Sequence, residues 1–260
     1  MLQKMVAMLA AGCACGAASP AMAADFPVKA ALPAYDWSGF YLGGYLGYGR
    51  QTGLAHFGPG NAFSQNYFVQ GWIPESLSTN ADGVLGGLQI GVNSQSGVLV
   101  YGVETDISFA ALKSDGVSTF VGAGANFVSG AGTKLDTLGT LRGRIGYTPW
   151  EHSLLYFTGG LAYGHAEMSS SVSVTNSIGQ VFCGPVGICA SATTAKWQAG
   201  WTVGGGWEQA VAQHWSVKLE YLYYDLGSIS HTITDVPSVA FADSHDFKGH
   251  IARAGVNYRF

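Results

Sequence analysis

Charge and long apolar runs are both scarce in this chain. Charged residues make up 11% of its 260 positions, whereas soluble domains carry about 25%. Although 48% of the residues are hydrophobic, no segment after residue 24 offers the roughly 20 consecutive apolar residues that a membrane-spanning helix needs. The apolar residues are therefore spread along the chain. A basic patch is lacking as well, which argues against nucleic-acid binding.

Cysteine is also rare, with four residues in total. Cys13 and Cys15 lie in the N-terminal segment, which leaves Cys183 and Cys189 in the rest of the chain. In an exported protein, an isolated pair at this spacing predicts a disulfide that pins a loop tip. A metal site would need further ligands nearby, and none is close in sequence. We expect no metal and no cofactor.

The N-terminus has the features of a secretory signal. Residues 1–23 combine a positive Lys4, a short apolar run from Met5 to Ala18 and the small-residue motif Ala21-Met22-Ala23. This order predicts a signal peptide cleaved after the motif. An alternative stays open, because Ala10-Ala11-Gly12-Cys13 partly resembles a lipoprotein cleavage box.

The remaining chain divides into two predicted parts. Residues 24–36, with their Ala and Pro content, are expected to form an extended periplasmic leader. Residues 37–260 are rich in glycine, which supplies 38 positions in the whole chain against a usual share of roughly 7%. Such a composition suits thin strands that pack closely in a barrel wall.

The last eleven residues alternate strictly between two faces. One face carries apolar and aromatic residues, and the other is mostly polar. A strand of this kind fits lipid on one side and a polar lumen on the other. The two faces are Ala252, Ala254, Val256, Tyr258 and Phe260, and Ile251, Arg253, Gly255, Asn257 and Arg259.

Eight alternating segments of this type predict an all-β fold, an eight-stranded antiparallel transmembrane β-barrel. Each is long enough for a tilted strand to cross the hydrocarbon, which takes about 9–11 residues. An even number places both termini in the periplasm. The segments are 37–49, 83–93, 99–109, 135–147, 154–165, 197–208, 215–225 and 250–260.

The connections alternate between short and long, as expected for short periplasmic turns and long extracellular loops. Aromatic residues gather toward the predicted strand ends and predict girdles at the two membrane interfaces. The short connections are 94–98, 148–153 and 209–214, and the long ones are 50–82, 110–134, 166–196 and 226–249. The predicted girdles are Trp37, Trp215, Tyr258 and Phe260 on the periplasmic side, and Tyr48, Phe109 and Tyr163 on the other.

Several motifs in these segments support a family comparison. They are Trp37-Ser-Gly-Phe-Tyr-Leu-Gly-Gly, Leu85-Gly-Gly-Leu-Gln, Gly102–Ile107, Leu141–Tyr147, Tyr156–Gly164, Gly200–Gly206 and Trp215–Gly227. With the leader Ala24-Asp-Phe-Pro-Val-Lys and the C-terminal strand, they resemble the outer-membrane immunogenic protein family of alpha-proteobacteria, which are small porin-like barrels. The resemblance covers nearly the whole mature chain. It implies an eight-stranded barrel in the outer membrane of a Gram-negative bacterium, but it does not extend to the cysteine pair.

Charged residues at inward positions of neighbouring strands predict ion pairs across the ladder. A barrel of eight strands is just wide enough for side chains to fill it, so these charges need partners. We expect a salt-bridged, mostly closed lumen. The alternative is a narrow water-filled path, for which inward glycines leave volume. The predicted network is Glu104, Asp106, Arg142, Arg144, Glu208, Lys218, Glu220, Arg253 and Arg259, and the inward glycines are Gly43, Gly47, Gly87, Gly91, Gly204 and Gly206.

Two other groups of polar residues were weighed for chemistry. His165, Ser108 and Asp225 lie near the outer rim, but nothing in the sequence brings them into one catalytic constellation. We therefore expect that the protein is not an enzyme. The last long connection is rich in imidazoles and carboxylates that could bind a divalent cation, although a solvated acidic surface is the more common outcome. These residues are His231, Asp235, Asp243, His245, Asp246 and His250.

The first function hypothesis is a structural surface protein that supports envelope integrity. A small low-conductance porin is the alternative, and an adhesin or receptor acting through exposed loop aromatics is a further one. The expected partners are outer-membrane lipid, lipopolysaccharide and the barrel-assembly machinery, and self-association is left open. The predicted assembly signal is Arg253, Gly255, Tyr258 and Phe260, and the loop aromatics are Phe57, Phe63, Tyr67, Phe68 and Trp72.

Overall fold

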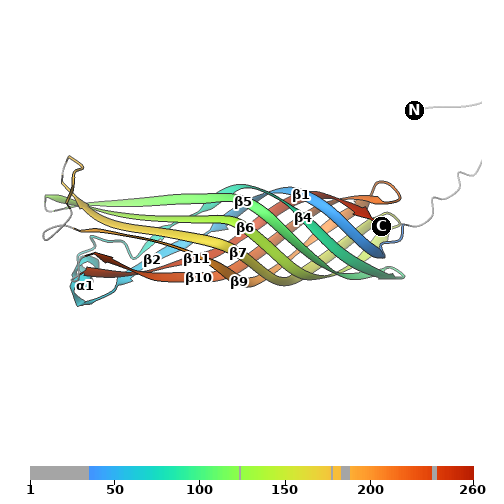
Figure 1. Ribbon diagram of the computed structural model, residues 1–260, viewed down its shortest axis with the longest axis horizontal. Helices are drawn as coiled ribbons and strands as arrows, with labels where there is room; N and C mark the ends of the chain where they lie inside the picture. Colours follow the sequence, from blue (N-terminus) through green and yellow to red (C-terminus); the bar gives the residue numbers. More distant parts are fainter. Residues whose placement is uncertain (1–34, 123, 177, 183–187, 236–238) are drawn as a thin grey trace, which may run out of the picture. The chain divides into compact units, whose positions relative to one another are not determined.

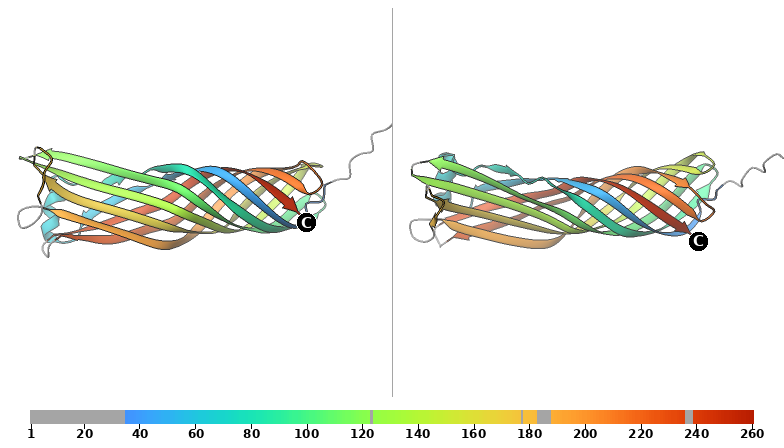
Figure 2. Two further views of the ribbon diagram at one scale, coloured as in Figure 1. Left: turned by 45° about the horizontal axis from the view of Figure 1, so that its top comes forward. Right: turned by 90° about the horizontal axis from the view of Figure 1, so that it is seen from above.

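Eight long antiparallel strands close into a barrel (Figures 1 and 2). The computed structural model describes residues 35–122, 124–176, 178–182, 188–235 and 239–260. The predicted signal peptide, nearly all of the predicted leader and Cys183 lie outside these residues. Around the wall the strands are β1 (Gly39–Thr52), β4 (Ala81–Ser96), β5 (Leu99–Gly122), β6 (Ala125–Trp150), β7 (Ser153–Thr175), β9 (Cys189–Ala210), β10 (Trp215–Asp235) and β11 (Val239–Arg259), and β11 pairs with β1 to close the ring.

The two-residue period of the sequence sets the two faces of the wall. On β1, Phe40, Leu42 and Leu46 are exposed, whereas Tyr41 and Tyr45 between them are buried. Successive side chains of a strand point to opposite faces of the sheet, so one face meets lipid and the other fills the barrel. The predicted eight-stranded barrel is confirmed.

The short periplasmic connections are tight turns. β4 and β5 are separated by residues 97–98, with Gly97 at φ +61°, a conformation that glycine adopts without a steric penalty. β6 and β7 are separated by residues 151–152, and β9 and β10 by residues 211–214. Because these turns are short, consecutive strands pair directly with each other.

The long extracellular segments are mostly strand rather than loop. β5 was predicted to end at Phe109 but continues to Gly122, and β6 begins at Ala125. The predicted loops 166–196 and 226–249 likewise continue β7, β9, β10 and β11. These segments are rich in Ser, Thr and Gly and lack the apolar alternation of a lipid-facing strand, because the outward face of the extension meets water. They were therefore predicted as loops.

Bulges mark the level at which the strands leave the lipid. Register shifts occur between Phe109 and Leu112 in the β5–β6 ladder, between Leu135 and Thr137 in the β6–β7 ladder, and between Asp225 and Ser228 in the β10–β11 ladder. A bulge inserts an extra residue into one strand and re-aims the side chains beyond it. On β10, odd-numbered residues therefore face outward on the periplasmic side of the bulge, and even-numbered residues face outward on its extracellular side.

The segment between β1 and β4 folds over the extracellular end. It contains β2 (Leu54–Pro59), α1 (Ala62–Val69) and β3 (Ser76–Ser78), and β2 pairs with β11 beyond the end of β1. Asn61 and Ser64 cap α1 with reciprocal side-chain to backbone hydrogen bonds of 2.9 and 3.2 Å. Figure 1 shows α1 at the end opposite the C-terminus. A short strand, β8 (Val181–Phe182), pairs with β7.

In the described part of the chain, no helix is long and apolar enough to span a membrane.

The inward glycines do not leave open volume, contrary to the sequence-based expectation. A Cβ built at Gly87 would lie 2.7 Å from the Tyr45 hydroxyl, and one at Gly206 would lie 2.6 Å from the Tyr156 hydroxyl. A large side chain from a neighbouring strand thus covers each of these two glycines. The same holds at Gly43, Gly47, Gly91 and Gly204, which are covered by Asn257, Arg253, Tyr41 and Leu222.

We expect Gly91→Ala to destabilise the barrel by about 1–3 kcal/mol, because the new methyl group collides with the Tyr41 ring. Gly143→Ala is the matched control, since Gly143 faces outward with only the Gly159 carbonyl oxygen nearby, at 3.9 Å. We expect its effect to stay within about 0.5 kcal/mol. Urea unfolding of the refolded protein in lipid vesicles measures both, and equal stabilities would contradict the covered-glycine packing.

Candidate functional site

The charged side chains inside the barrel form a neutral cluster shielded from solvent. Alternation places four acids and four bases inward, and each residue is at most 5% exposed. Glu104 lies opposite Arg142, Lys218 opposite Glu208, and Glu220 opposite Arg253. We call this set the lumenal network: Glu104, Asp106, Arg142, Arg144, Glu208, Lys218, Glu220 and Arg253.

Arg142 is the central cation of the lumenal network. Its guanidinium donates to Glu104, to Asp106 Oδ2 at 2.8 Å and to Glu220 Oε1 at 3.1 Å. Its Nε donates to Thr140 Oγ1 at 2.9 Å. Because β6 and β10 are not neighbours in the wall, the bond from Arg142 to Glu220 crosses the lumen.

Three further cations complete the pairing. Arg253 donates to Glu220 Oε2 at 2.5 Å and to Asp106 Oδ2 at 3.1 Å. Lys218 Nζ lies 3.1 Å from both carboxylate oxygens of Glu104, and Arg144 donates to Glu208 at 2.8 Å. Each carboxylate of the lumenal network therefore contacts at least one cation.

Tyrosines that sequence reasoning missed complete the network. Tyr41 donates to Glu104 at 2.8 Å, Tyr45 to Asp106 at 3.1 Å and Tyr156 to Glu220 at 2.9 Å. Their inward orientation could have been predicted from the sequence, because on β1 and β7 these tyrosines alternate with the lipid-facing residues. The rings also stack on guanidinium groups, with Arg144 4.0 Å from the centroid of Tyr156.

Apolar layers lie on both sides of the lumenal network. Toward the periplasm, Trp37, Leu154 and Tyr156 belong to one buried cluster. Toward the outside, Leu135, Leu138 and Met168 belong to a second, larger one. The order of inward residues along β7 shows the succession, from Leu154 and Tyr156 through Thr158 to Ala162, Ala166, Met168, Ser170 and Val172.

Arg259 and Trp37 close the periplasmic mouth. Arg259 lies apart from the lumenal network, where it donates to the Trp37 carbonyl oxygen and contacts the Tyr35 and Trp37 rings. Trp37 is fully buried, so its assignment to an outward aromatic girdle was wrong. It was read as the start of a lipid-facing strand, but β1 begins at Gly39 and Trp37 folds under the barrel instead.

A second polar cluster lies in the extracellular extension. Asp243 Oδ2 accepts from Ser170 and lies 2.9 Å from His245 Nε2 and 3.9 Å from His231 Nε2. Burial lowers the pKa of His231. Among the described residues, no group of three or more His, Cys, Asp or Glu is arranged to hold a metal.

The other residues weighed as cation ligands lie elsewhere. Asp246 pairs with Lys248 at 3.4 Å, and His250 Nδ1 lies 2.5 Å from the Tyr221 hydroxyl. The side chain of Asp235 lies outside the described part of the structure. The sequence placed these residues in one loop, but they belong to two strands and point both into the barrel and away from it.

The rim residues weighed for catalysis have separate partners. Ser108 donates to the Leu138 carbonyl oxygen inside the barrel at 2.9 Å. His165 Nδ1 lies 3.1 Å from Asp136 Oδ1, and Asp225 accepts from the Gly227 amide at 2.8 Å. The structure does not bring the three together.

The aromatics of the first extracellular segment form a cap and not an open binding surface. Trp72 stacks on Phe127 at 4.7 Å, and Tyr67 and Phe68 pack against Phe241. Phe57 is buried, so of the five predicted loop aromatics only Phe63 is an exposed large side chain. These rings pack onto a third buried apolar cluster at the extracellular end.

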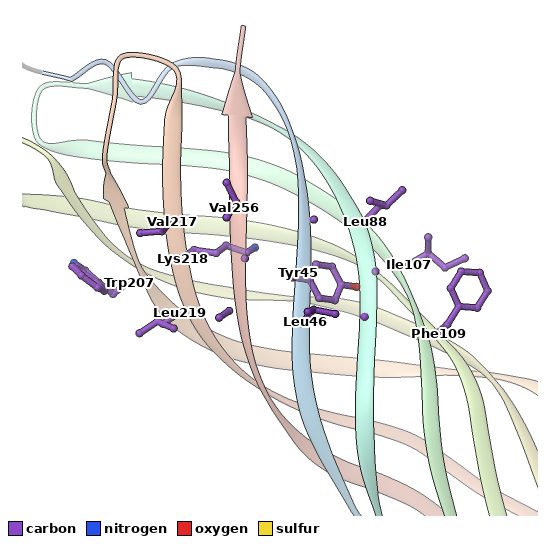
Figure 3. A pocket seen from close by; sticks show the side chains of 15 residues that line it. Tyr45, Leu46, Leu88, Ile107, Phe109, Trp207, Val217, Lys218, Leu219 and Val256 are labelled. Atoms are coloured by element: carbon purple, nitrogen blue, oxygen red, sulfur yellow. The ribbon is translucent and has the colours of Figure 1, made fainter.

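The outer wall carries a shallow apolar groove at the level of the lipid. It has a volume of about 870 Å³ and lies above small residues such as Gly44, Gly86 and Ala254. Figure 3 shows Trp207 and Leu219 on one side of it and Ile107 and Phe109 on the other. Because most of its lining, such as Leu46, Leu88 and Val256, faces outward, acyl chains can fill it in a membrane.

Together, the closed strand ring, the lipid-facing apolar wall and the paired interior define a bacterial outer-membrane β-barrel protein. The model of the family described as "Outer membrane protein beta-barrel domain" matches residues 9–260, and the chain belongs to this family.

Relatives of known name agree with this assignment. The chain is 34% identical over 266 residues to the 31 kDa outer-membrane immunogenic protein of Brucella melitensis, covering 98% of this chain and 100% of the relative. It is 29% identical to the 22 kDa outer membrane protein of Rhizobium leguminosarum, covering 92% and 83%. These comparisons place the protein in the outer membrane and confirm the alpha-proteobacterial resemblance.

The structure of OprG from Pseudomonas aeruginosa is similar in fold. It superposes with a TM-score of 0.53 at 12% sequence identity, covering 87% of this chain and 97% of OprG. At this identity the likeness concerns the barrel alone.

We expect Arg142→Met to destabilise the protein by about 3–5 kcal/mol, because it leaves buried carboxylates without their central cation. The matched control is Lys134→Met, which removes an exposed partner of Asp136 and should cost at most about 1 kcal/mol. Urea unfolding in lipid vesicles compares the two. Equal losses would mean that the lumenal charges are solvated like surface charges.

Proposed function

We propose that the protein is a closed, non-catalytic surface protein of the outer membrane with a structural role in the envelope. The observation that carries this proposal is the continuous filling of the lumen. The periplasmic plug at Trp37, the lumenal network and the apolar cluster around Leu138 follow each other along the barrel. The same observation counts against the porin alternative.

Ion passage through this interior would have to break paired charges. A permeating cation or anion must displace one side of a bond such as Arg142 to Glu220, which leaves the other side buried and unpaired. Breaking a buried pair typically costs about 3–5 kcal/mol. The apolar layers add a second barrier, because they offer an ion few polar contacts.

The extracellular extension is the part that other molecules meet. β5, β6, β7 and β9 continue beyond the bulge level, and exposed residues such as Val117, Val121 and Ile178 lie near the hairpin ends. The Brucella relative is called an outer-membrane immunogenic protein. We propose the same surface accessibility for this chain.

The C-terminal strand is proposed as the signal for the barrel-assembly machinery. Phe260 is 68% exposed, its amide donates to the Phe40 carbonyl oxygen at 3.0 Å, and its ring contacts Tyr258. Gly255 and Arg253 lie inward on the same strand. The outward aromatic pair at the seam between β1 and β11 therefore stays available to another protein.

Planar bilayers test the closed lumen. We expect the refolded mature protein to give no stable current steps, and we expect Arg142→Ala/Glu220→Ala, which removes two large central side chains while keeping charge balance, to stay closed as well, because the apolar layers on both sides remain. Heat-modifiable gel migration confirms folding of both proteins. Steps of similar size from the unchanged protein and the double variant would contradict the proposal.

Deleting Phe260 tests the assembly signal. We expect a several-fold lower yield of folded protein in the outer membrane, because the outward aromatic at the end of the last strand is lost. Phe63→Ala, which removes an exposed aromatic from α1, is the control and should leave the yield unchanged. Equal yields of the deletion variant and the unchanged protein would refute the signal.

A further inference from the structure

The extracellular extension, unlike the membrane part of the wall, is not a closed ring. The ladder between β9 and β10 ends at Trp201 and Asp225, although β9 begins at Cys189 and β10 continues to Asp235. Beyond that point, in the part of the chain that the structure describes, β9 pairs only with β7 and β10 only with β11. Residues 189–200 and 226–235 therefore form two strand edges that face a seam, which we call the β9 edge and the β10 edge.

The bulge on β10 ends the ladder between these strands. From Asp225 to Ser228, β10 advances by one residue more than its partner β11, and Gly227 adopts φ +77°. An extra residue of this kind bends the strand that carries it. Because β9 has no matching shift against β7, β9 and β10 lose their common register at this level.

The exposure of Lys196 shows that the seam is open to solvent. Even-numbered residues of β9 point inward, and Ala190 and Thr202 are buried accordingly. Lys196 has the same parity but is exposed. His231 on β10, which lies close enough to Lys196 to feel its charge, is only half-buried. The wall therefore does not cover its inward side chains at this level.

The other seam of the extension, beside β5, is covered. β4 begins at Ala81, so β5 also continues beyond its partner strand. Residues of β3 lie against β5 there, because a Cβ built at Gly116 would lie 2.8 Å from the Ser78 carbonyl oxygen and 3.3 Å from Leu77. Among the described residues, no strand covers the β9 and β10 edges in this way.

The two edges also lack the usual protection against pairing with another chain. Exposed edges normally carry charges, prolines or bulges that prevent such pairing. Residues 189–195 of β9 and 228–234 of β10 contain no Asp, Glu, Lys, Arg or Pro. Lys196 and Asp225 lie at the membrane ends of the two edges, where the ladder within the chain begins. Both edges can therefore accept a further strand.

We propose that the seam joins two copies of this protein, with the β9 edge of each copy paired to the β10 edge of the other. All copies cross the membrane in the same orientation, so β9 runs toward the periplasm and β10 away from it in each. A twofold rotation about the membrane normal keeps these directions, which makes β9 antiparallel to the partner's β10, as in the ladder within one chain. A second copy offers both edges at the same height above the membrane, and twofold interfaces are the commonest in homo-oligomers.

The lipid-facing wall next to the seam suits the same contact. Three of the chain's seven tryptophans, Trp197, Trp201 and Trp207, are exposed on β9, and Leu219 and Tyr221 are exposed on β10. Aromatic residues are enriched at protein interfaces. When the edges of two copies pair, these side chains lie between the two barrels and extend the interface into the membrane.

Sedimentation equilibrium of the refolded mature protein in neutral detergent tests the dimer. We expect the unchanged protein to be a dimer. Thr193→Lys/Ala195→Lys/Thr232→Lys should associate at least about tenfold more weakly, because like charges at opposed positions destabilise a ladder. All three side chains are exposed, and heat-modifiable gel migration confirms folding. If the unchanged protein stays monomeric at every attainable concentration, the proposal is overturned.

The matched control places the same three charges at the other end of the sheet. Val117→Lys/Thr119→Lys/Val121→Lys changes exposed residues of β5 and should form dimers as the unchanged protein does. Equally weak association of this control and the seam variant would show a general effect of charge and would overturn the pairing at the seam.

Mixing oppositely charged variants identifies the two edges as partners. Thr193→Glu/Ala195→Glu/Thr232→Glu should associate as weakly on its own as the lysine variant does. An equimolar mixture of the two variants should form dimers, because each β9 edge then meets a β10 edge of opposite charge. A mixture that associates no better than either variant alone would overturn the pairing of β9 with the partner's β10.

Discussion

Charge neutrality inside the barrel is the constraint on which the rest of the structure depends. A buried charge is tolerated only when partners compensate for its lost hydration. The lumenal network meets this condition with four acids and four bases, and Arg142 bonds to carboxylates on both walls. Such a network fixes the strand register, because a shift of one residue would turn its members toward lipid.

The other interior features follow from keeping this network dry. Glycines at inward positions let tyrosines from neighbouring strands lie across the lumen, as Tyr41 does over Gly91 and Tyr45 over Gly87. Their hydroxyl groups then reach the carboxylates. The Trp37 plug and the apolar cluster around Leu138 lie on either side of the network, which supports the proposal of a closed wall component.

The membrane-spanning part of the fold could be predicted from the sequence, whereas the extracellular extension of the strands could not. Alternation identified the eight strands and the inward charges, because lipid outside and partners inside impose opposite demands on successive residues. It could not be continued past the bulges near Leu112, Thr137 and Ser228, where the register shifts. The Trp37 plug and the aromatic cap around Phe241 were missed for another reason, since both arise from contacts between segments far apart in the chain.

A double-mutant cycle on Arg142 and Glu220 tests the neutral, dry lumen most directly. Urea unfolding in lipid vesicles would compare Arg142→Met, Glu220→Gln and the double variant. If the pair is shielded from water, the double variant should be more stable than the sum of the single losses implies, by at least about 1 kcal/mol. Losses that add to within about 0.5 kcal/mol would show that water solvates these charges independently, which would contradict the account.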